Sequence, residues 1–313
     1  MRVAVTGADG FVGRWLIRDL AGAGHEVVAA GADRPDVTDA EALGAWIADS
    51  RPAAIVHLAA VSSGTAASKD AERAFAVTVG GTVNLLEAVR RIDPSPIVLI
   101  PSSGEVYGRP TPGELPLSEA ASLRPHGPYA LSKAAQESVA LAIGGRSNVR
   151  VVVARAFNHT GPGQRPDFVV PALAARIAAV AAGRASEVVV GNLDVARDFL
   201  DVRDVVRAYR LLLEGARSGA VAGGTIVNVC SGRSITIRRI VEQLCRQARV
   251  DAPITVDPAL VRAGEVAEVR GDPSLLRSLV DWRPEIPFDR TLDDVLAAAA
   301  EQDGTPVATT RSR

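Results

Sequence analysis

The chain has 313 residues, 47% of them hydrophobic and 23% charged, which predicts a globular protein of one large domain or two. A formal net charge of −1 argues against binding to nucleic acid or to an anionic membrane. The two cysteines form neither a CxxC motif nor a Cys/His cluster, so no metal site and reduced, cytoplasmic thiols are expected. Neither a signal peptide nor an apolar run of about 18 residues is visible, so no membrane association is expected.

Short apolar strands alternate with longer helices through the first half of the chain. The expected strands are Arg2–Val5, Glu26–Ala30, Ala54–His57, Pro96–Ile100 and Val149–Arg155. The expected helices are one that ends at Leu20, then Ala40–Asp49, Asp70–Arg91 and Tyr129–Gly144. This order predicts βαβ units and therefore an α/β fold with a doubly wound parallel Rossmann sheet. The nearly continuous apolar strands fit a sheet that is covered on both faces.

The rhythm changes after about residue 160, where Gly161–Asp167 forms a Gly/Pro loop. Further elements are expected at Pro171–Ala182, Glu187–Val190, Asp201–Leu213, Thr225–Val229 and Ile237–Arg246, followed by Pro-rich turns. We divide the chain into a Rossmann domain at residues 1–160, a smaller α/β substrate-binding region at 161–300 and a flexible polar tail at 301–313. Some elements of the second region are expected to return to the sheet.

A glycine-rich turn follows the first strand. Gly7, Gly10 and Gly13 form a GxxGxxG pattern in which the first glycine permits a tight turn and the others permit close approach of a pyrophosphate and of the helix. Phe11 and Val12 then begin a helix whose N-terminal N–H groups and dipole attract phosphate. Three glycines alone are weak evidence, but their place between a buried strand and a helix favours a dinucleotide site over a ligand-free turn.

The second strand lacks the acid that normally binds the adenosine ribose of NAD. Its end is Ala29–Ala32, with Asp33 coming late and Arg34 directly after it. An arginine without a competing acid leaves room for a 2′-phosphate, so NADP(H) is favoured over NAD(H).

The next segment offers a second cofactor contact. Asp36 and Val37 can place a carboxylate and a backbone N–H against the adenine. The alternative, which can coexist with the first, is that Thr38 or Asp39 caps the helix at Ala40.

Tyr129 and Lys133 lie one helical turn apart and therefore share a helix face. A tyrosine is a poor acid or base at neutral pH, and a nearby lysine stabilises its phenolate and can reach the nicotinamide ribose. The spacing alone is common by chance, and in isolation a surface pair is the better interpretation. Together with the glycine turn, the pair predicts proton transfer during hydride chemistry.

The strand at Pro96–Ile100 runs into polar residues at the sheet edge where ligands bind. Ser103 is the candidate for polarising a substrate carbonyl, and Ser102 is expected to be structural. Glu105 is a candidate general base or a ligand for a sugar hydroxyl, and the alternative is a loop carboxylate that faces water.

These motifs resemble the extended short-chain dehydrogenase/reductase family, whose members act on nucleotide-diphosphate sugars. The resemblance covers roughly residues 1–295 and rests on the segments Thr6–Gly13, His57–Ala60, Ser102–Gly108 and Pro128–Lys133. It implies cofactor contacts from Leu58, Ala59 and Ala60, a substrate contact from Ser62, and a homodimer through the long helices.

The second half resembles the branch that contains GDP-mannose 4,6-dehydratases and GDP-4-keto-6-deoxymannose reductases, through residues 155–164, 191–204 and 227–232. The resemblance implies that the nucleotide-sugar is held by Asn158, Arg197, Arg262 and Glu265. The alternative for the two arginines is surface ion pairing. One departure is Thr78, where the family often has asparagine near the active site.

Two reactions compete. In a 4-ketoreductase, hydride reaches C4 of a GDP- or dTDP-linked 4-keto-6-deoxyhexose while Ser103 polarises the carbonyl and Tyr129 protonates the oxygen. In a 4,6-dehydratase, or a 4-epimerase, C4 is first oxidised, and in the dehydratase Glu105 removes the C5 proton. The similarity of residues 187–232 to the reductase favours the first reaction. A non-enzymatic NAD(P)-binding protein is a third hypothesis, disfavoured because Ser103, Tyr129 and Lys133 are all present.

Overall fold

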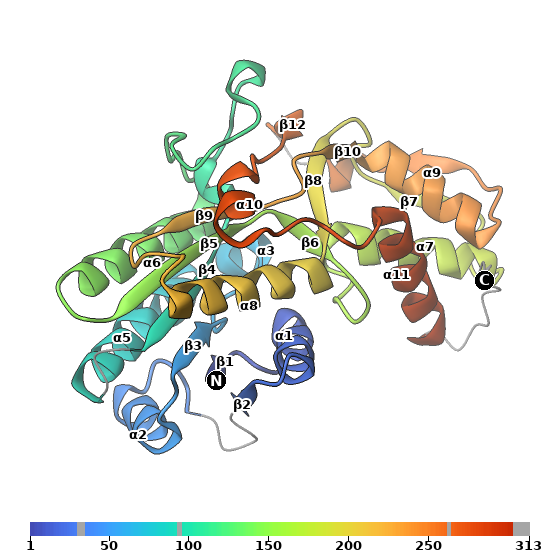
Figure 1. Cartoon of the computed structure of the whole chain (residues 1–313). Helices are drawn as coiled ribbons and strands as arrows, with labels where there is room; N and C mark the ends of the chain where they lie inside the picture. Colours follow the sequence, from blue (N-terminus) through green and yellow to red (C-terminus); the bar gives the residue numbers. More distant parts are fainter. Residues whose placement is uncertain (30–34, 93–95, 262–263, 303–313) are drawn as a thin grey trace.

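The computed structural model describes residues 1–29, 35–92, 96–261 and 264–302, so the predicted ligands Arg34 and Arg262 lie outside the described residues. Its centre is a six-stranded sheet in the order β2-β1-β3-β4-β5-β9 (Figure 1), and every pair of neighbours is parallel. The strands are β1 (Arg2–Thr6), β2 (Glu26–Ala29), β3 (Ala54–His57), β4 (Ile97–Ser103), β5 (Arg150–Ala156) and β9 (Ile226–Val229). Because β2 and β3 lie on opposite sides of β1, the strand order reverses there, which is where such sheets bind ligands.

Helices cover both faces of the sheet, as the apolar strands predict. One face carries α2 (Ala40–Ser50), α5 (Gly81–Ile92) and α6 (Gly127–Gly145), and the other carries α1 (Phe11–Gly22) and α8 (Val202–Ser218). Alternate residues of β4 enter the two cores: Ile97 and Leu99 pack toward α1 and α8, while Val98 and Ile100 pack toward α2 and α5. The predicted doubly wound Rossmann fold is therefore confirmed.

A smaller lobe lies beyond one end of the sheet (Figure 1). Its helices are α7 (Val169–Ala181), α9 (Ile237–Ala248) and α11 (Phe288–Gln302), which share a separate apolar core. Its strands are β6 (Asn158–Thr160), β7 (Val188–Val190), β8 (Ala196–Asp201), β10 (Ser234–Thr236), β11 (Ile254–Val256) and β12 (Glu268–Val269). Strand β8 pairs with β6, β10 and β12, and β7 pairs with β11. The second half also returns to the main sheet through α8 and β9.

Short elements complete the described chain. They are α3 (Gly64–Lys69), α4 (Ala71–Phe75), α10 (Ser274–Val280) and the 3-10 turns Gly104–Tyr107, Pro112–Glu114 and Pro258–Leu260. Within the described ranges, no helix combines the length and apolar character needed to cross a membrane.

The predicted helix Asp70–Arg91 is present but not uniform. Asp70 caps α4 by accepting the Arg73 N–H, and a π-helical segment, Ala76–Gly80, joins α4 to α5. Thr78, in this segment, is fully buried, and Gly81 directly after it packs so closely on Val37 that a β-carbon would lie 2.6 Å from the valine Cγ2. The predicted long helix is confirmed over nearly its whole length, but the π-helical insertion is not visible in the sequence, because one inserted residue changes the apolar spacing little.

Candidate active site

The glycine turn brings three backbone segments into close contact. Gly7 has φ +67°, and a β-carbon on it would lie 2.7 Å from the Ala59 nitrogen. A β-carbon on Gly13 would lie 2.5 Å from the Gly7 carbonyl oxygen, so α1 rests directly on the turn. Gly10 is the N-cap of α1 and has no side chain to accept the first N–H groups of the helix. The first N–H groups of α1 therefore face outward as a site for a phosphate group.

Three further contacts fix this turn. The Thr6 hydroxyl accepts the Ala59 N–H at 3.2 Å and hydrogen-bonds His57 Nδ1 at 2.8 Å. Phe11 stacks on His159, with ring centroids 6.4 Å apart. These contacts hold the Leu58–Ala60 segment and the start of β6 beside the glycine turn, as expected of a cofactor cleft.

The segment before α2 is held by its own side chains. Asp39 is the N-cap and accepts the N–H groups of the first helical turn, so the capping role falls to Asp39. Asp36 instead accepts the N–H and hydroxyl of Thr38, which lower the pKa of its carboxyl. Asn84 of α5 donates to the Val37 carbonyl at 3.0 Å. Asp36 and Val37 thus form a rigid edge, and their contact with adenine stays a prediction.

Ser103, Tyr129 and Lys133 meet at the carboxyl end of β4. Ser103 is the last residue of β4, and its hydroxyl accepts the Glu105 N–H at 3.1 Å. That bond uses a lone pair of the oxygen, so the hydroxyl proton remains to be donated, to Tyr129 or to a bound carbonyl group. The Ser103 side chain also hydrogen-bonds Tyr129, which stands in the first turn of α6.

Tyr129 is the only one of the three tyrosines that is not fully buried, since Tyr107 and Tyr209 are at most 1% exposed. Burial of its hydroxyl and the negative charge of Glu105 raise the pKa of Tyr129, and the bond from Ser103 partly offsets them. The phenol is therefore protonated at neutral pH and is suited to give a proton. Glu105 is exposed in the 3-10 turn after Ser103 and acts on this phenol through its charge.

Lys133 is 5% exposed, and its ammonium donates to the Pro101 carbonyl at 2.8 Å and to Gln136 Oε1 at 3.0 Å. Burial lowers the pKa of Lys133 to about 8, and the carboxylate of Glu137 opposes that shift. Only two of the 35 lysine and arginine residues are lysines, Lys69 and Lys133. A buried lysine in so arginine-rich a chain fits a role that needs a compact, titratable cation.

A buried ion pair joins α6, the helix that carries Tyr129 and Lys133, to strand β5. Glu137 accepts three hydrogen bonds of 2.7–3.1 Å from Arg155 of β5, and both side chains are at most 4% exposed. The Ser102 hydroxyl also donates to Glu137. Ser102 therefore has a structural partner, in keeping with the prediction that Ser103 is the serine that faces the substrate.

Three of the predicted sugar-nucleotide ligands, Asn158, Arg197 and Glu265, lie on the smaller lobe. Arg197 of β8 donates to the Val266 carbonyl at 2.8 Å, which places it next to Glu265. Glu265 Oε2 is buried without a hydrogen-bond partner among the described residues. Asn158 begins β6, which pairs with β8, and is half-buried. Ser62 is exposed in the loop after β3. These roles stay predictions.

Arg109 is a neighbour of this region that the sequence does not single out. Its guanidinium lies against Gly264, where a β-carbon would be 3.1 Å from Nη1. The contact joins the loop after Ser103 to the segment that holds Glu265. No motif marks Arg109, because the contact depends on two loops that are far apart in the chain.

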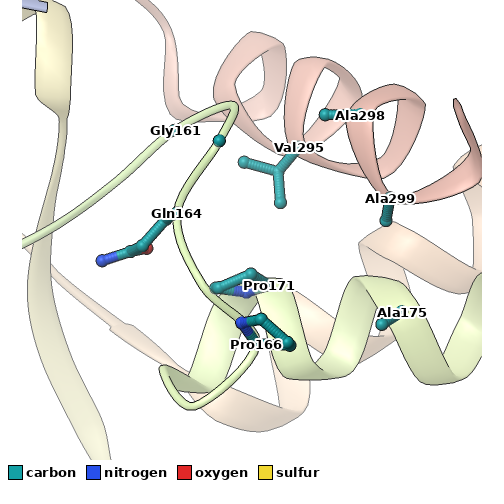
Figure 2. A pocket seen from close by; sticks show the side chains of 9 residues that line it. Gly161, Gln164, Pro166, Pro171, Ala175, Val295, Ala298 and Ala299 are labelled. Carbon is teal, nitrogen blue, oxygen red and sulfur yellow. The ribbon is translucent and has the colours of Figure 1, made fainter. Parts of the chain in front are cut away.

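A separate cavity of about 190 Å³ lies between the loop at Gly161, α7 and α11 (Figure 2). Its lining is mainly alanine, proline and valine, with Gln164 at one side, and the described residues that form it include no charged side chain. None of the catalytic candidates lines it. The described residues also contain no group of three His, Cys, Asp or Glu side chains that could hold a metal ion.

A dinucleotide-binding sheet with serine, tyrosine and lysine at its carboxyl edge defines an NAD(P)-dependent oxidoreductase of the short-chain type. A family model described as GDP-mannose 4,6 dehydratase matches residues 32–295. The chain is 40% identical over 299 residues to the GDP-6-deoxy-D-mannose reductase of Pseudomonas aeruginosa, covering 95% of this chain and 96% of that protein.

Solved structures agree with this assignment. The structure of RMD from Pseudomonas aeruginosa complexed with NADPH matches with a TM-score of 0.89 at 37% identity, covering 96% of this chain and 99% of that one. The UDP-glucose 4-epimerase of Thermus thermophilus complexed with NAD matches with a TM-score of 0.83 at 27% identity, covering 96% and 99%. The chain belongs to the GDP-mannose 4,6-dehydratase family of short-chain nucleotide-sugar enzymes.

Proposed function

We propose that this protein reduces the C4 ketone of a nucleotide-diphosphate 4-keto-6-deoxyhexose and takes the hydride from NADPH. The observation that carries the proposal is the placement of the Tyr129 phenol beside the Ser103 hydroxyl at the carboxyl end of β4, one helical turn from Lys133. The 40% identity to a protein named GDP-6-deoxy-D-mannose reductase supports the same reaction and a GDP-linked sugar.

In the proposed reduction each part of the site has a separate role. The open N-terminus of α1 would hold the pyrophosphate of NADPH, which supplies the hydride that reaches C4. Ser103 donates its hydroxyl proton in a hydrogen bond to the C4 oxygen and so stabilises the charge that develops there. Tyr129 then gives its proton to that oxygen, and the Lys133 ammonium stabilises the resulting phenolate.

The nucleotide-sugar would lie against the smaller lobe. Arg197 supplies positive charge for a diphosphate, and Asn158 can accept and donate hydrogen bonds. The Glu265 oxygen without a partner among the described residues would accept a hydrogen bond from a ribose hydroxyl or a base N–H. We also propose a preference for NADPH over NADH, supported by the NADPH-bound relative, together with a homodimer and a cytoplasmic location.

A 4,6-dehydratase is the second candidate, because the Glu105 carboxylate is close enough to Tyr129 to raise its pKa. In that reaction Glu105 would remove the C5 proton after C4 has been oxidised. The 40% identity to a protein named GDP-6-deoxy-D-mannose reductase favours the reduction over this alternative.

The test is incubation of the purified protein with NADPH and GDP-4-keto-6-deoxymannose. We expect NADPH oxidation in equal amount to the reduced sugar nucleotide, and almost none in a Tyr129→Phe variant that binds NADPH normally. Formation of a 4-keto sugar from GDP-mannose without net use of NADPH would instead identify a dehydratase. The dTDP-linked keto sugar and NADH, tested in parallel, measure the preference for nucleotide and cofactor.

A further inference from the structure

A chain of hydrogen bonds runs inward from the Lys133 ammonium. Lys133 Nζ donates to Gln136 Oε1 at 3.0 Å, and Gln136 Nε2 donates to Thr82 Oγ1 at 2.9 Å. The Thr82 hydroxyl donates to the Thr78 carbonyl at 2.7 Å. Gln136, Thr82 and Thr78 are 0% exposed, so water does not compete for these bonds.

The far end of the chain fixes its direction. A carbonyl oxygen can only accept a hydrogen bond, so the single hydroxyl proton of Thr82 must be the one donated to the Thr78 carbonyl. Thr82 Oγ1 can then only accept from Gln136, which must turn its NH₂ group toward Thr82. The amide oxygen of Gln136 is thereby held toward Lys133, where it accepts a hydrogen bond and favours the charged form of the amine.

The chain of hydrogen bonds ends in the π-helical segment. Thr78 stands in that segment, and its carbonyl oxygen accepts from Thr82. The Thr78 hydroxyl is buried without a partner among the described residues, so the threonine takes part through its backbone and not its side chain. The support for the lysine comes from Gln136, on the same helix as Lys133 and one turn further along.

We propose that Gln136 is a positioning residue that orients the Lys133 ammonium and stabilises its charge. The Gln136 amide oxygen and the Pro101 carbonyl each accept one N–H of the Lys133 ammonium. These two bonds determine the direction of the third N–H, because the three are arranged tetrahedrally. The titratable groups around Lys133 are Glu137, whose charge acts on the amine, His57 at the end of β3, which the Lys133 charge affects in turn, and Tyr129, one turn earlier on α6. Glu137 favours the ammonium, and His57 is neutral at the pH of the experiment.

The chain offers a direct measurement because it contains only two lysines. Protein labelled with ¹³Cε-lysine in a Lys69→Arg background has a single lysine signal, whose chemical shift follows the titration of Lys133. We expect a midpoint of about 8 for the parent protein. Gln136→Leu removes the acceptor and should lower the midpoint by roughly one pH unit, whereas Gln136→Glu adds a negative charge and should raise it by a similar amount.

Two variants of Thr82 keep Gln136 itself. Thr82→Val removes the acceptor that orients the Gln136 amide. It should lower the titration midpoint of Lys133, but by less than Gln136→Leu does. Thr82→Ser keeps the hydroxyl and should leave the midpoint unchanged. A midpoint in folded Gln136→Leu equal to that of the parent would overturn the proposal, and if Gln136→Leu does not fold, equal midpoints in Thr82→Val and the parent would do so. The proposal rests on Lys133 as part of the proposed active site, but the titration needs no substrate, so its failure is distinguishable from failure of the proposed reduction.

Discussion

Neutral His57 should make the stability of this protein depend on pH. The side chain is 0% exposed, and burial, aided by the nearby Lys133 charge, lowers its pKa from 6.5 to about 3. A depressed pKa means that the unfolded chain binds the proton more tightly than the folded one. Stability from this group is therefore complete above about pH 6.5 and is lost as the pH falls from there toward about 3. Each pH unit in that window costs about 1.4 kcal/mol, so the loss between about pH 7.5 and about pH 5 is about 2 kcal/mol.

The assay is urea unfolding at both pH values for the parent protein and for His57→Asn, which keeps a hydrogen-bonding atom near Thr6 but does not titrate. Other groups titrate in this window, so the informative quantity is the difference between the two proteins. We expect the parent to lose about 2 kcal/mol more than His57→Asn on acidification. An equal loss in both proteins would refute the reasoning, because it would mean that the buried imidazole is protonated in the folded state or is reached by water.

Three further predictions concern the ion pair of Glu137 with Arg155, the side chain of Arg109, and the glycine turn. Glu137→Gln leaves Arg155 as a buried, uncompensated charge, and chemical unfolding should show a loss of about 3 kcal/mol, more than any exposed Glu→Gln control. Because Arg109 lies against the segment that holds the predicted ligand Glu265, we expect Arg109→Gln to raise KM for the sugar nucleotide roughly fivefold with kcat nearly unchanged, and a lower kcat with the same KM would contradict this. Gly13→Ala should weaken NADPH binding at least about tenfold in a fluorescence titration, since the new methyl group collides with backbone oxygen atoms, and unchanged affinity would refute the close packing of α1 on the turn.

The sequence predicts most of the sheet because its signals are local. Strands such as Ile97–Ser103 are apolar on both faces, and each is separated from the next by a helix of ordinary length, which leaves few arrangements open. The glycine turn was predictable for the same reason, since Gly7 and Gly13 are needed by contacts within one βα unit. The ends of the strands were predicted less accurately than their positions. Strand β4 continues through Ser102 to Ser103, beyond the predicted end at Ile100.

Features that depend on distant partners could not be predicted. Strand β8 carries Arg197 and Asp198 among its residues, so its composition does not suggest a strand, and it exists because β6, β10 and β12 surround it. The roles of Arg109 and Gln136 likewise follow from contacts across the fold, and a single sequence gives no signal for them. Ser103, Tyr129 and Lys133 could be proposed from the sequence because chemistry restricts which residue types can serve in proton transfer.

The state of Lys133 depends on a balance that no single contact explains. Burial favours the neutral amine, while Glu137 and the Gln136 amide oxygen favour the ammonium. Glu137 also carries the ion pair with Arg155, so its charge is shared with a guanidinium, and its effect on the lysine is smaller than that of an isolated carboxylate would be. A pKa of about 8 is the outcome, close enough to neutrality for the charge to respond to a cofactor or a substrate. It follows that Glu137→Gln should lower both the stability and the titration midpoint of Lys133, whereas Gln136→Leu should have its larger effect on the midpoint.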